Sequence, residues 1–127
     1  GMPMGPIELM DTVGLDVGKS VATELGHDIP ADSKFARLIA EGKLGRKTGE
    51  GFYKWEKGKA QKGETPSHPD LAGLGKELVK PLVDMTEVVV AEGVVASPEL
   101  ADIGVIMGTG FAPFLGGPMK ARADGRA

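Results

Sequence analysis

The sequence contains no cysteine among its 127 residues. A disulfide, a thiolate nucleophile and a cysteine-ligated metal site are therefore excluded, and the absence fits a reducing compartment such as the cytoplasm. No apolar run approaches the roughly 20 residues that a membrane-spanning helix needs. The first residues show no basic segment followed by an apolar core, so no signal peptide is visible. We expect a cytoplasmic chain without a membrane span.

An excess of positive charge is also lacking. Fifteen Lys and Arg residues stand against 18 Asp and Glu, which gives a formal net charge of −3. Such a balance provides no general attraction to nucleic acid or to an anionic membrane, so any anion site must be local. Glycine, in contrast, is abundant: 20 residues are glycine, which is about twice the usual frequency.

Helix signals dominate the chain. Pro6 at a first turn and Gly14 as a stop predict a short helix in "GPIELMDTVG". Two more helices are expected before residue 44, the second capped by Asp32 or Ser33. Beyond them, the pattern predicts a long helix at 75–93, a helix that starts at Ser97, and a short exposed helix at "MKARADG". The apolar stripe expected on the long helix consists of Leu78, Leu82, Met85 and Val89.

The stretch at 56–70, "EKGKAQKGETPSHPD", has no apolar residue larger than alanine and is rich in Gly, Pro, Lys and Ser. This composition is typical of a linker or an exposed loop. We therefore divide the chain into residues 1–55, a linker at 56–74, and residues 75–127.

No self-contained active site emerges from the motifs. "VGLDVGKS" ends like a phosphate-binding loop, but Val13 occupies the position of the first required glycine. "TGEGF" is not a dinucleotide fingerprint, because Lys54 stands where the third glycine should be. His27 and His68 lie in polar stretches without spaced carboxylates nearby, so we expect no metal site.

Two stretches share a loose pattern. "MGPIELMD" near the start and "LGGPMKARAD" near the end both contain Gly-Pro, a short helix and an Asp, although Asp124 lies one residue later relative to its proline. As a pair they suggest two related helical units, the second entered through the helix at 75–93.

"PMGPIELMDTVGLD" followed by "LGRKTGEGFYKW" resembles the C-terminal domain of 3-hydroxyacyl-CoA dehydrogenases. "LVKPLVDMTEVVVAEGVVASPELADIGVIMGTGFAPFLGGPM" resembles a second copy of that domain. Two copies in tandem are the mark of the multifunctional fatty-acid β-oxidation proteins, which fuse enoyl-CoA hydratase to the dehydrogenase. The resemblance implies an all-α small helical bundle, similar to the C-terminal domain of 6-phosphogluconate dehydrogenase, with at most one short extended segment near 51–55.

The resemblance also implies where the chemistry of the parent enzyme lies. In this family NAD binds an upstream Rossmann domain, whose histidine and glutamate remove the 3-hydroxyl proton; neither has a counterpart here. The "PMGP" turn faces the catalytic cleft in the family, so Pro3, Met4 and Gly5 are the expected substrate-proximal residues. We expect no catalytic residue, no cofactor-binding residue and no metal ligand in this chain, and no activity of the chain in isolation.

"GRKTGEGFYKW" resembles the turn and extended segment of the same family. Gly45, Gly49 and Gly51 are expected to supply backbone freedom, and Phe52, Tyr53 and Trp55 a partly buried edge. Arg46 and Lys47 are candidates for contact with the CoA phosphates, against the alternative of a structural role.

The leading interpretation is thus a fragment of an NAD-dependent 3-hydroxyacyl-CoA dehydrogenase that shapes the cleft for an acyl-CoA and packs domains or subunits together. The alternative is a free-standing helical assembly module. The first three helices alone would leave Leu9, Leu15, Leu25 and Leu38 in an open groove. We therefore expect the helix at 75–93 to dock there, either in one hybrid domain or in a domain-swapped dimer, with a homodimer as the simplest assembly.

Overall fold

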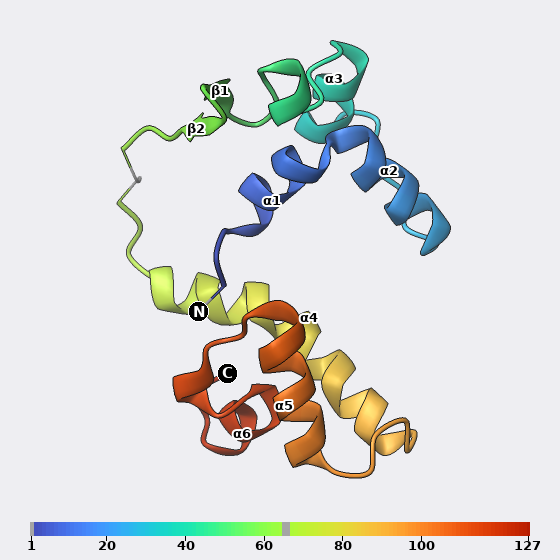
Figure 1. Ribbon diagram of the computed structural model, residues 1–127, viewed down its shortest axis with the longest axis vertical. Coiled ribbons are helices and arrows are strands. Elements are labelled where there is room, and N and C mark those ends of the chain that lie inside the picture. Colours follow the sequence, from blue (N-terminus) through green and yellow to red (C-terminus); the bar gives the residue numbers. More distant parts are fainter. Residues whose placement is uncertain (1, 65–66) are drawn as a thin grey trace. The chain divides into compact units, whose positions relative to one another are not determined.

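The structure is a computed structural model that describes residues 2–64 and 67–127. Helices form most of it, and the described strands make one small two-stranded sheet (Figure 1). The predicted helical class is therefore confirmed. The chain forms two compact units, here called the N-terminal unit (Met4–Thr65) and the C-terminal unit (Pro66–Ala127, with which Gly1–Pro3 group). Each unit is described by itself.

The N-terminal unit begins with a helical pair whose boundary the sequence marks clearly. Pro6 occupies the first turn of α1, and Gly14, with a φ of 110°, separates α1 from α2. A positive φ of this kind costs a glycine little, whereas other residues rarely adopt it. Ser33 caps the third helix by accepting a hydrogen bond from the Ala36 N–H at 3.1 Å. The elements of this unit are α1 (Pro6–Val13), α2 (Leu15–Glu24), α3 (Lys34–Ala40), the 3₁₀ turn η1 (Arg46–Thr48), β1 (Lys54–Glu56) and β2 (Lys59–Gln61).

Leu15 and Leu38 form the apolar centre of the N-terminal unit, with exposed fractions of 0% and 7%. The rings of Phe35 and Phe52 face each other in the same unit, with their centroids 6.1 Å apart. The expectation that Leu15 and Leu38 line an open groove is therefore wrong, because contacts among α1, α2 and α3 bury both side chains. Leu9 and Leu25, however, are exposed, as expected for residues of an open apolar groove.

The extended segment continues into a hairpin that the sequence did not predict. β1 pairs antiparallel with β2, so that Trp55 lies opposite Ala60. Lys57 and Gly58 form the two-residue turn, with φ values of 49° and 76°, which is the backbone geometry of a tight type I′ hairpin turn. The second strand lies inside the range 56–74 that was expected to be linker.

The C-terminal unit consists of α4 (Leu71–Ala91), α5 (Pro98–Thr109), the 3₁₀ turn η2 (Pro113–Leu115) and α6 (Pro118–Ala123). Asp70 caps α4, which begins four residues earlier than the predicted start. Val83 and Thr86 are the buried residues of α4, while Leu78 and Met85 are 69% and 62% exposed. The buried face of α4 is therefore shifted by about one residue from the apolar stripe that the sequence predicted.

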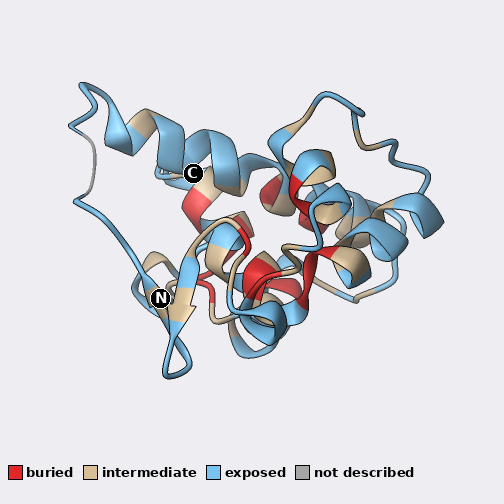
Figure 2. Cartoon of the chain, turned by 90° about the horizontal axis from the view of Figure 1, so that it is seen from above, coloured by how far each residue is buried: buried red, intermediate tan, exposed pale blue. Residues whose placement is uncertain are grey.

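Small side chains allow α6 to approach α4 and α5 closely. Pro118 and Ala121 are buried, which corrects the expectation of an exposed final helix. Ala101 and Phe111 complete the buried apolar set of this unit together with Val83. Figure 2 shows how few positions are buried compared with the exposed surface.

Many large apolar side chains of both units are exposed. Six apolar residues are buried, whereas 17 large apolar residues are at least 40% exposed among the described residues. In residues 2–64 and 67–127, none of the helices has the length and apolar character to cross a bilayer. An apolar surface of this extent is typical of contact with other protein. The expected docking of the helix at 75–93 on the first three helices stays a prediction.

Candidate functional site

A buried carboxylate organises the segment that follows the third helix. Asp11 lies on the inner face of α1 and has an exposed fraction of 0%. Its Oδ1 accepts a hydrogen bond from the Phe52 N–H at 2.8 Å, and its Oδ2 accepts from the Tyr53 N–H at 2.9 Å. The indole Nε1–H of Trp55 donates to the same Oδ2 at 3.0 Å. Three donors thus satisfy a buried carboxylate that pairs with no cation among the described residues. This arrangement gives Asp11 a structural role.

Two glycines make room for Asp11, one beside its backbone and one beside its carboxylate. A β-carbon at Gly51 would lie 2.3 Å from Asp11 Oδ1, and one at Gly45 would lie 2.2 Å from the Asp11 carbonyl oxygen. Gly45 and Gly49 also have positive φ values of 101° and 82°, as expected from their backbone freedom. Gly51 has no positive φ, so its requirement is space beside Asp11 and the Gly45 backbone rather than backbone conformation.

Arg46 and Lys47, the two candidates for CoA contact, lie in η1 next to α1 and are exposed. The Lys47 ammonium donates to both carboxylate oxygens of Asp16 at 2.5 and 2.6 Å. The Arg46 guanidinium lies 6.0 Å from the centroid of the Trp55 ring, in a cation–π arrangement. Both cations therefore have partners within the N-terminal unit.

The Lys47 ammonium lowers the pKa of Asp16 below its usual value, first through its hydrogen bonds and then through its charge. The pair lies at the surface, with about 45% of each side chain exposed. Solvent and salt weaken such a pair, so an approaching phosphate could compete with Asp16 for Lys47.

The expected substrate-proximal turn lies at the other end of α1. Gly5 is the residue before the first helical turn, and Met4 is half-buried while Pro3 and Gly5 are exposed. Lys47 lies beside Gly14, which follows the last residue of α1. An eight-residue helix is about 12 Å long. The structure therefore holds Met4 and Gly5 apart from Lys47 by about the length of α1.

The described residues contain no group of three or more His, Asp or Glu side chains that could hold a metal ion. His68 Nδ1 accepts a hydrogen bond from the Asp70 N–H at 3.0 Å, so it helps to shape the turn before α4. His27 is exposed and follows the end of α2. No arrangement of a base with a nucleophile appears in the described part of either unit.

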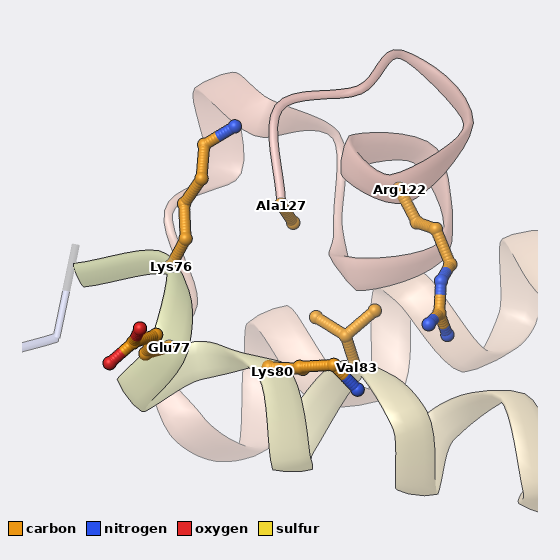
Figure 3. A pocket seen from close by; sticks show the side chains of 6 residues that line it. All are labelled: Lys76, Glu77, Lys80, Val83, Arg122 and Ala127. Atoms are coloured by element: carbon orange, nitrogen blue, oxygen red, sulfur yellow. The ribbon is translucent and has the colours of Figure 1, made fainter. Parts of the chain in front are cut away.

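A pocket of about 240 Å³ lies in the C-terminal unit between α4, α6 and the last residue (Figure 3). Three of its lining residues are cations, but each has a partner. The Arg122 guanidinium donates to Asp84 and Glu87, both at 2.7 Å, and the Lys80 ammonium donates to Asp84. The Lys76 ammonium donates to the Gly125 carbonyl oxygen at 3.2 Å. The pocket is therefore largely neutralised and is a weak candidate for binding an anion.

The N-terminal unit has a second pocket of about 230 Å³, between α2, α3 and the loop before α3. Ile29, Ala31, Ala36 and Ile39 line it, with Lys19 at its polar side. No side chain suited to acid–base chemistry lies among these residues, so the pocket offers an apolar surface without a reaction centre.

Comparison with known proteins shows what the chain is similar to. Residues 1–55 match the family described as 3-hydroxyacyl-CoA dehydrogenase, C-terminal domain. The match contains α1, α2, α3 and the segment that Asp11 fixes.

Most of the chain is similar to alpha subunits of the fatty acid oxidation complex. The chain is 38% identical to the fatty acid oxidation complex subunit alpha of Shewanella amazonensis, over 94% of its own length. It is 39% identical to the protein of the same name from Shewanella oneidensis, over 93% of its length. The chain spans 19% of the length of each of these relatives. The resemblance to the dehydrogenase family and to β-oxidation proteins is therefore confirmed.

Asp11 and Asp102 are buried structural residues, one in each unit, whose hydrogen-bond partners sequence reasoning did not identify. Asp102 has an exposed fraction of 6%. Its carboxylate accepts hydrogen bonds from the backbone N–H groups of Met119 and Lys120 at 2.7 and 3.0 Å. A signal was present, because each Asp lies among apolar residues of a helix, where an unpaired carboxylate would be costly. The donors, however, lie 41 and 17 residues further along the chain and could not be identified from spacing.

Proposed function

We propose that this chain is a C-terminal part of an NAD-dependent 3-hydroxyacyl-CoA dehydrogenase of fatty-acid β-oxidation. The observation that carries the proposal is its similarity, over 93–94% of its length, to fatty acid oxidation complex alpha subunits. The match of residues 1–55 to the C-terminal domain of 3-hydroxyacyl-CoA dehydrogenases also supports it. The parent reaction is hydride transfer from C3 of a 3-hydroxyacyl-CoA to NAD, in a soluble cytoplasmic enzyme.

The role of the chain within that enzyme is to shape the acyl-CoA cleft and to pack against other parts of the protein. The structure supports a packing role through its large exposed apolar surface. Its titratable groups support no independent chemistry, because Asp11 is fixed by three donors and the cations of the C-terminal unit are paired. NAD binding and proton abstraction are assigned to an upstream Rossmann domain, and an enoyl-CoA hydratase domain in the same polypeptide is compatible with this assignment. A homodimer or domain-swapped dimer is the assembly we propose.

The experiment is an assay of NADH formation from 3-hydroxybutyryl-CoA, monitored at its absorbance maximum. The full-length protein that contains this chain should catalyse the reaction, whereas the purified chain should not exceed the buffer background. Orientation of the substrate and positioned proton transfer supply much of such a rate enhancement, and both depend on the upstream domain. Activity of the chain alone, or inactivity of a folded full-length protein, would refute the proposal.

Within the cleft, we assign Pro3, Met4 and Gly5 to the vicinity of the substrate. A β-carbon at Gly5 would meet nothing within 4 Å, and Gly5 has an ordinary φ of −74°. Gly5→Ala should therefore leave the fold intact, and a severalfold rise of KM in the full-length enzyme would report closeness to substrate. Gly63→Ala is a matched control, because it also meets nothing within 4 Å. Equal KM values for the two variants would remove Gly5 from the cleft.

We further assign Arg46 and Lys47 to the CoA phosphates. A phosphate that binds Lys47 must displace or share Asp16, which gives the assignment a sharp test. In the full-length enzyme, Lys47→Ala should raise KM, whereas Asp16→Ala should leave KM unchanged or lower it by freeing the ammonium. Arg46→Ala should raise KM as well, and Lys59→Ala, at an exposed position of β2, serves as the control. If Asp16→Ala and Lys47→Ala raise KM equally, the pair has only a structural role.

A further inference from the structure

The apolar pocket of the N-terminal unit has a single charged residue on its lining. The pocket has a volume of about 230 Å³ and lies between α2, α3 and the loop that joins them. Lys19 of α2 is the charged residue, and the other lining residues are apolar: Ile29, Ala31, Ala36 and Ile39. Because an apolar cavity of about 150 Å³ holds benzene, the volume here suits a ligand of roughly six to eight carbon atoms.

Hydrogen bonds hold the loop wall of this pocket in place. The His27 N–H donates to the Ala22 carbonyl oxygen at 2.8 Å, which fixes the start of the loop to the end of α2. The Ser33 N–H donates to the Pro30 carbonyl oxygen at 3.0 Å, and the Ser33 side chain caps α3. The loop is thus tied down at both ends. A pocket that is formed in advance loses little conformational freedom when a ligand binds.

The ammonium of Lys19 has no partner of opposite charge in the part of the chain that the structure describes. Asp16, one turn earlier on α2, pairs with Lys47 instead. An unpaired cation at the polar side of an apolar pocket favours a ligand with two parts. One part is an anion that binds the ammonium, and the other is an apolar group that fills the pocket.

We propose that this pocket binds an aliphatic monocarboxylate, with the carboxylate on the Lys19 ammonium and the hydrocarbon tail against Ile29, Ala36 and Ile39. The carboxylate accepts charge-assisted hydrogen bonds from the ammonium. The tail gains free energy because its apolar surface leaves water. Lys19 has the only polar side chain of the lining, so a sugar or an amino acid would leave polar groups unpaired there. None of the lining residues belongs to the substrate-proximal turn or to the proposed CoA contacts, so the site does not depend on the proposed function.

The test is an NMR titration of the purified chain with hexanoate. The backbone amide signals of the lining residues should shift together and reach saturation. From butanoate to hexanoate, binding should tighten about threefold to fourfold for each added methylene group, because each one is removed from water. Hexanol has a similar tail without the charge, so it should bind about twofold to fivefold more weakly than hexanoate. Shifts that do not saturate, or equal affinities for butanoate, hexanoate and hexanol, overturn the proposal.

Lys19→Met tests the head group, because it keeps an unbranched side chain of similar length and removes the charge. Hexanoate should bind this variant about twofold to fivefold more weakly than it binds the parent chain, whereas hexanol binding should be unchanged. Lys54→Met, at an exposed position of β1 outside the pocket, is the matched control and should bind hexanoate like the parent chain. A preference for hexanoate over hexanol that persists in Lys19→Met overturns the proposal.

Ala36→Leu tests the place of the tail, because the larger side chain fills the pocket. Hexanoate should lose most of its affinity for this variant, whereas Ala40→Leu, at an exposed position of α3 outside the pocket, should bind hexanoate normally. Circular dichroism checks that both variants fold, and Lys19→Met decides the question where Ala36→Leu does not fold. In the parent chain, shifts of equal midpoint at Val21 and Leu25, which are exposed on or next to α2, overturn the proposal, because hexanoate would then bind the general apolar surface.

Discussion

Asp11 Oδ2 and Trp55 Nε1 are joined by a 3.0 Å hydrogen bond across 44 residues of chain. This bond connects the inner face of α1 with the first strand of the hairpin. Because the same carboxylate also binds the N–H groups of Phe52 and Tyr53, one side chain fixes the whole segment that follows η1. The single tryptophan of the chain is thus a direct fluorescent reporter of this latch.

Removal of the Asp11 carboxylate should strongly destabilise the N-terminal unit. Asp11→Ala leaves three N–H donors without their acceptor and opens a small void, and we expect a loss of about 3 kcal/mol in the free energy of unfolding. Urea unfolding followed by Trp55 emission measures this loss. Asp28→Ala, at an exposed loop position, is the control, and we expect it to stay within about 0.5 kcal/mol of the parent. A similarly small effect of Asp11→Ala would show that the latch contributes little.

The pair of Asp11 and Trp55 should also be energetically coupled. Trp55→Phe keeps much of the ring while it removes the indole donor, so the double variant with Asp11→Ala should lose less than the two single losses added together. We expect a coupling of about 1 kcal/mol, typical of residues in one hydrogen-bonded network. Circular dichroism replaces fluorescence for this cycle, because Trp55→Phe removes the only tryptophan. Additive losses would mean that the bond contributes nothing of its own.

The helix boundaries could be predicted because their causes are local. Gly14 stops α1, Ser33 caps α3 and Ser97 caps α5, and each acts on residues within one or two turns. The face of α4 could not be predicted from its own periodicity. Apolar residues surround much of this helix, so the position of α5 and α6 decides that Val83 is buried and Leu78 is exposed.

The candidate site was predictable only in part. The residues of η1 and the glycines around it were singled out correctly as a turn, because Gly45 and Gly49 have the expected positive φ. The partner of Lys47, Asp16, lies 31 residues away, and the donors of Asp11 lie further still. Contacts of this range depend on how the helices pack, which local patterns do not encode.

The space beside Asp11 makes Gly51 intolerant of even one methyl group. A β-carbon there would lie 2.3 Å from Asp11 Oδ1, so Gly51→Ala should cost about 1–3 kcal/mol through steric displacement of the latch. In an Asp11→Ala background the same substitution should cost less, because the clash with the carboxylate is gone while the one with Gly45 Cα, at 2.6 Å, remains. Unfolding curves of the two single variants and the double variant give the comparison. An undiminished cost in the Asp11→Ala background would show that the clash with the Gly45 backbone dominates.

The titration of Asp16 should report its partner Lys47. The folded pKa of Asp16 lies below the usual value of 3.8, so the stabilisation from this pair is present above that value and is lost as pH falls through the folded pKa. Carboxyl-carbon NMR should therefore give a midpoint below 3.8 that returns toward 3.8 in Lys47→Ala. Salt at about 1 M should reduce the shift, because the pair is exposed to solvent. A midpoint that ignores both Lys47→Ala and salt would assign the shift to another cause.

Asp102 should contribute to the C-terminal unit as Asp11 does to the N-terminal unit, though with two donors instead of three. Asp102→Ala uncaps α6 and removes its link to α5, and we expect a loss of about 2 kcal/mol together with faster exchange at the Met119 and Lys120 amides. Asp102→Asn retains one good acceptor oxygen, so its loss should be intermediate. Amide exchange resolves the site, with Glu87 in the middle of α4 as the internal control.

Because the close approach between Gly117 and Asp102 leaves no room for a longer side chain at position 102, Asp102→Glu should not restore stability, even though it restores the charge. Full recovery in Asp102→Glu would show that charge near the helix end, and not the close two-donor geometry, holds α6 in place.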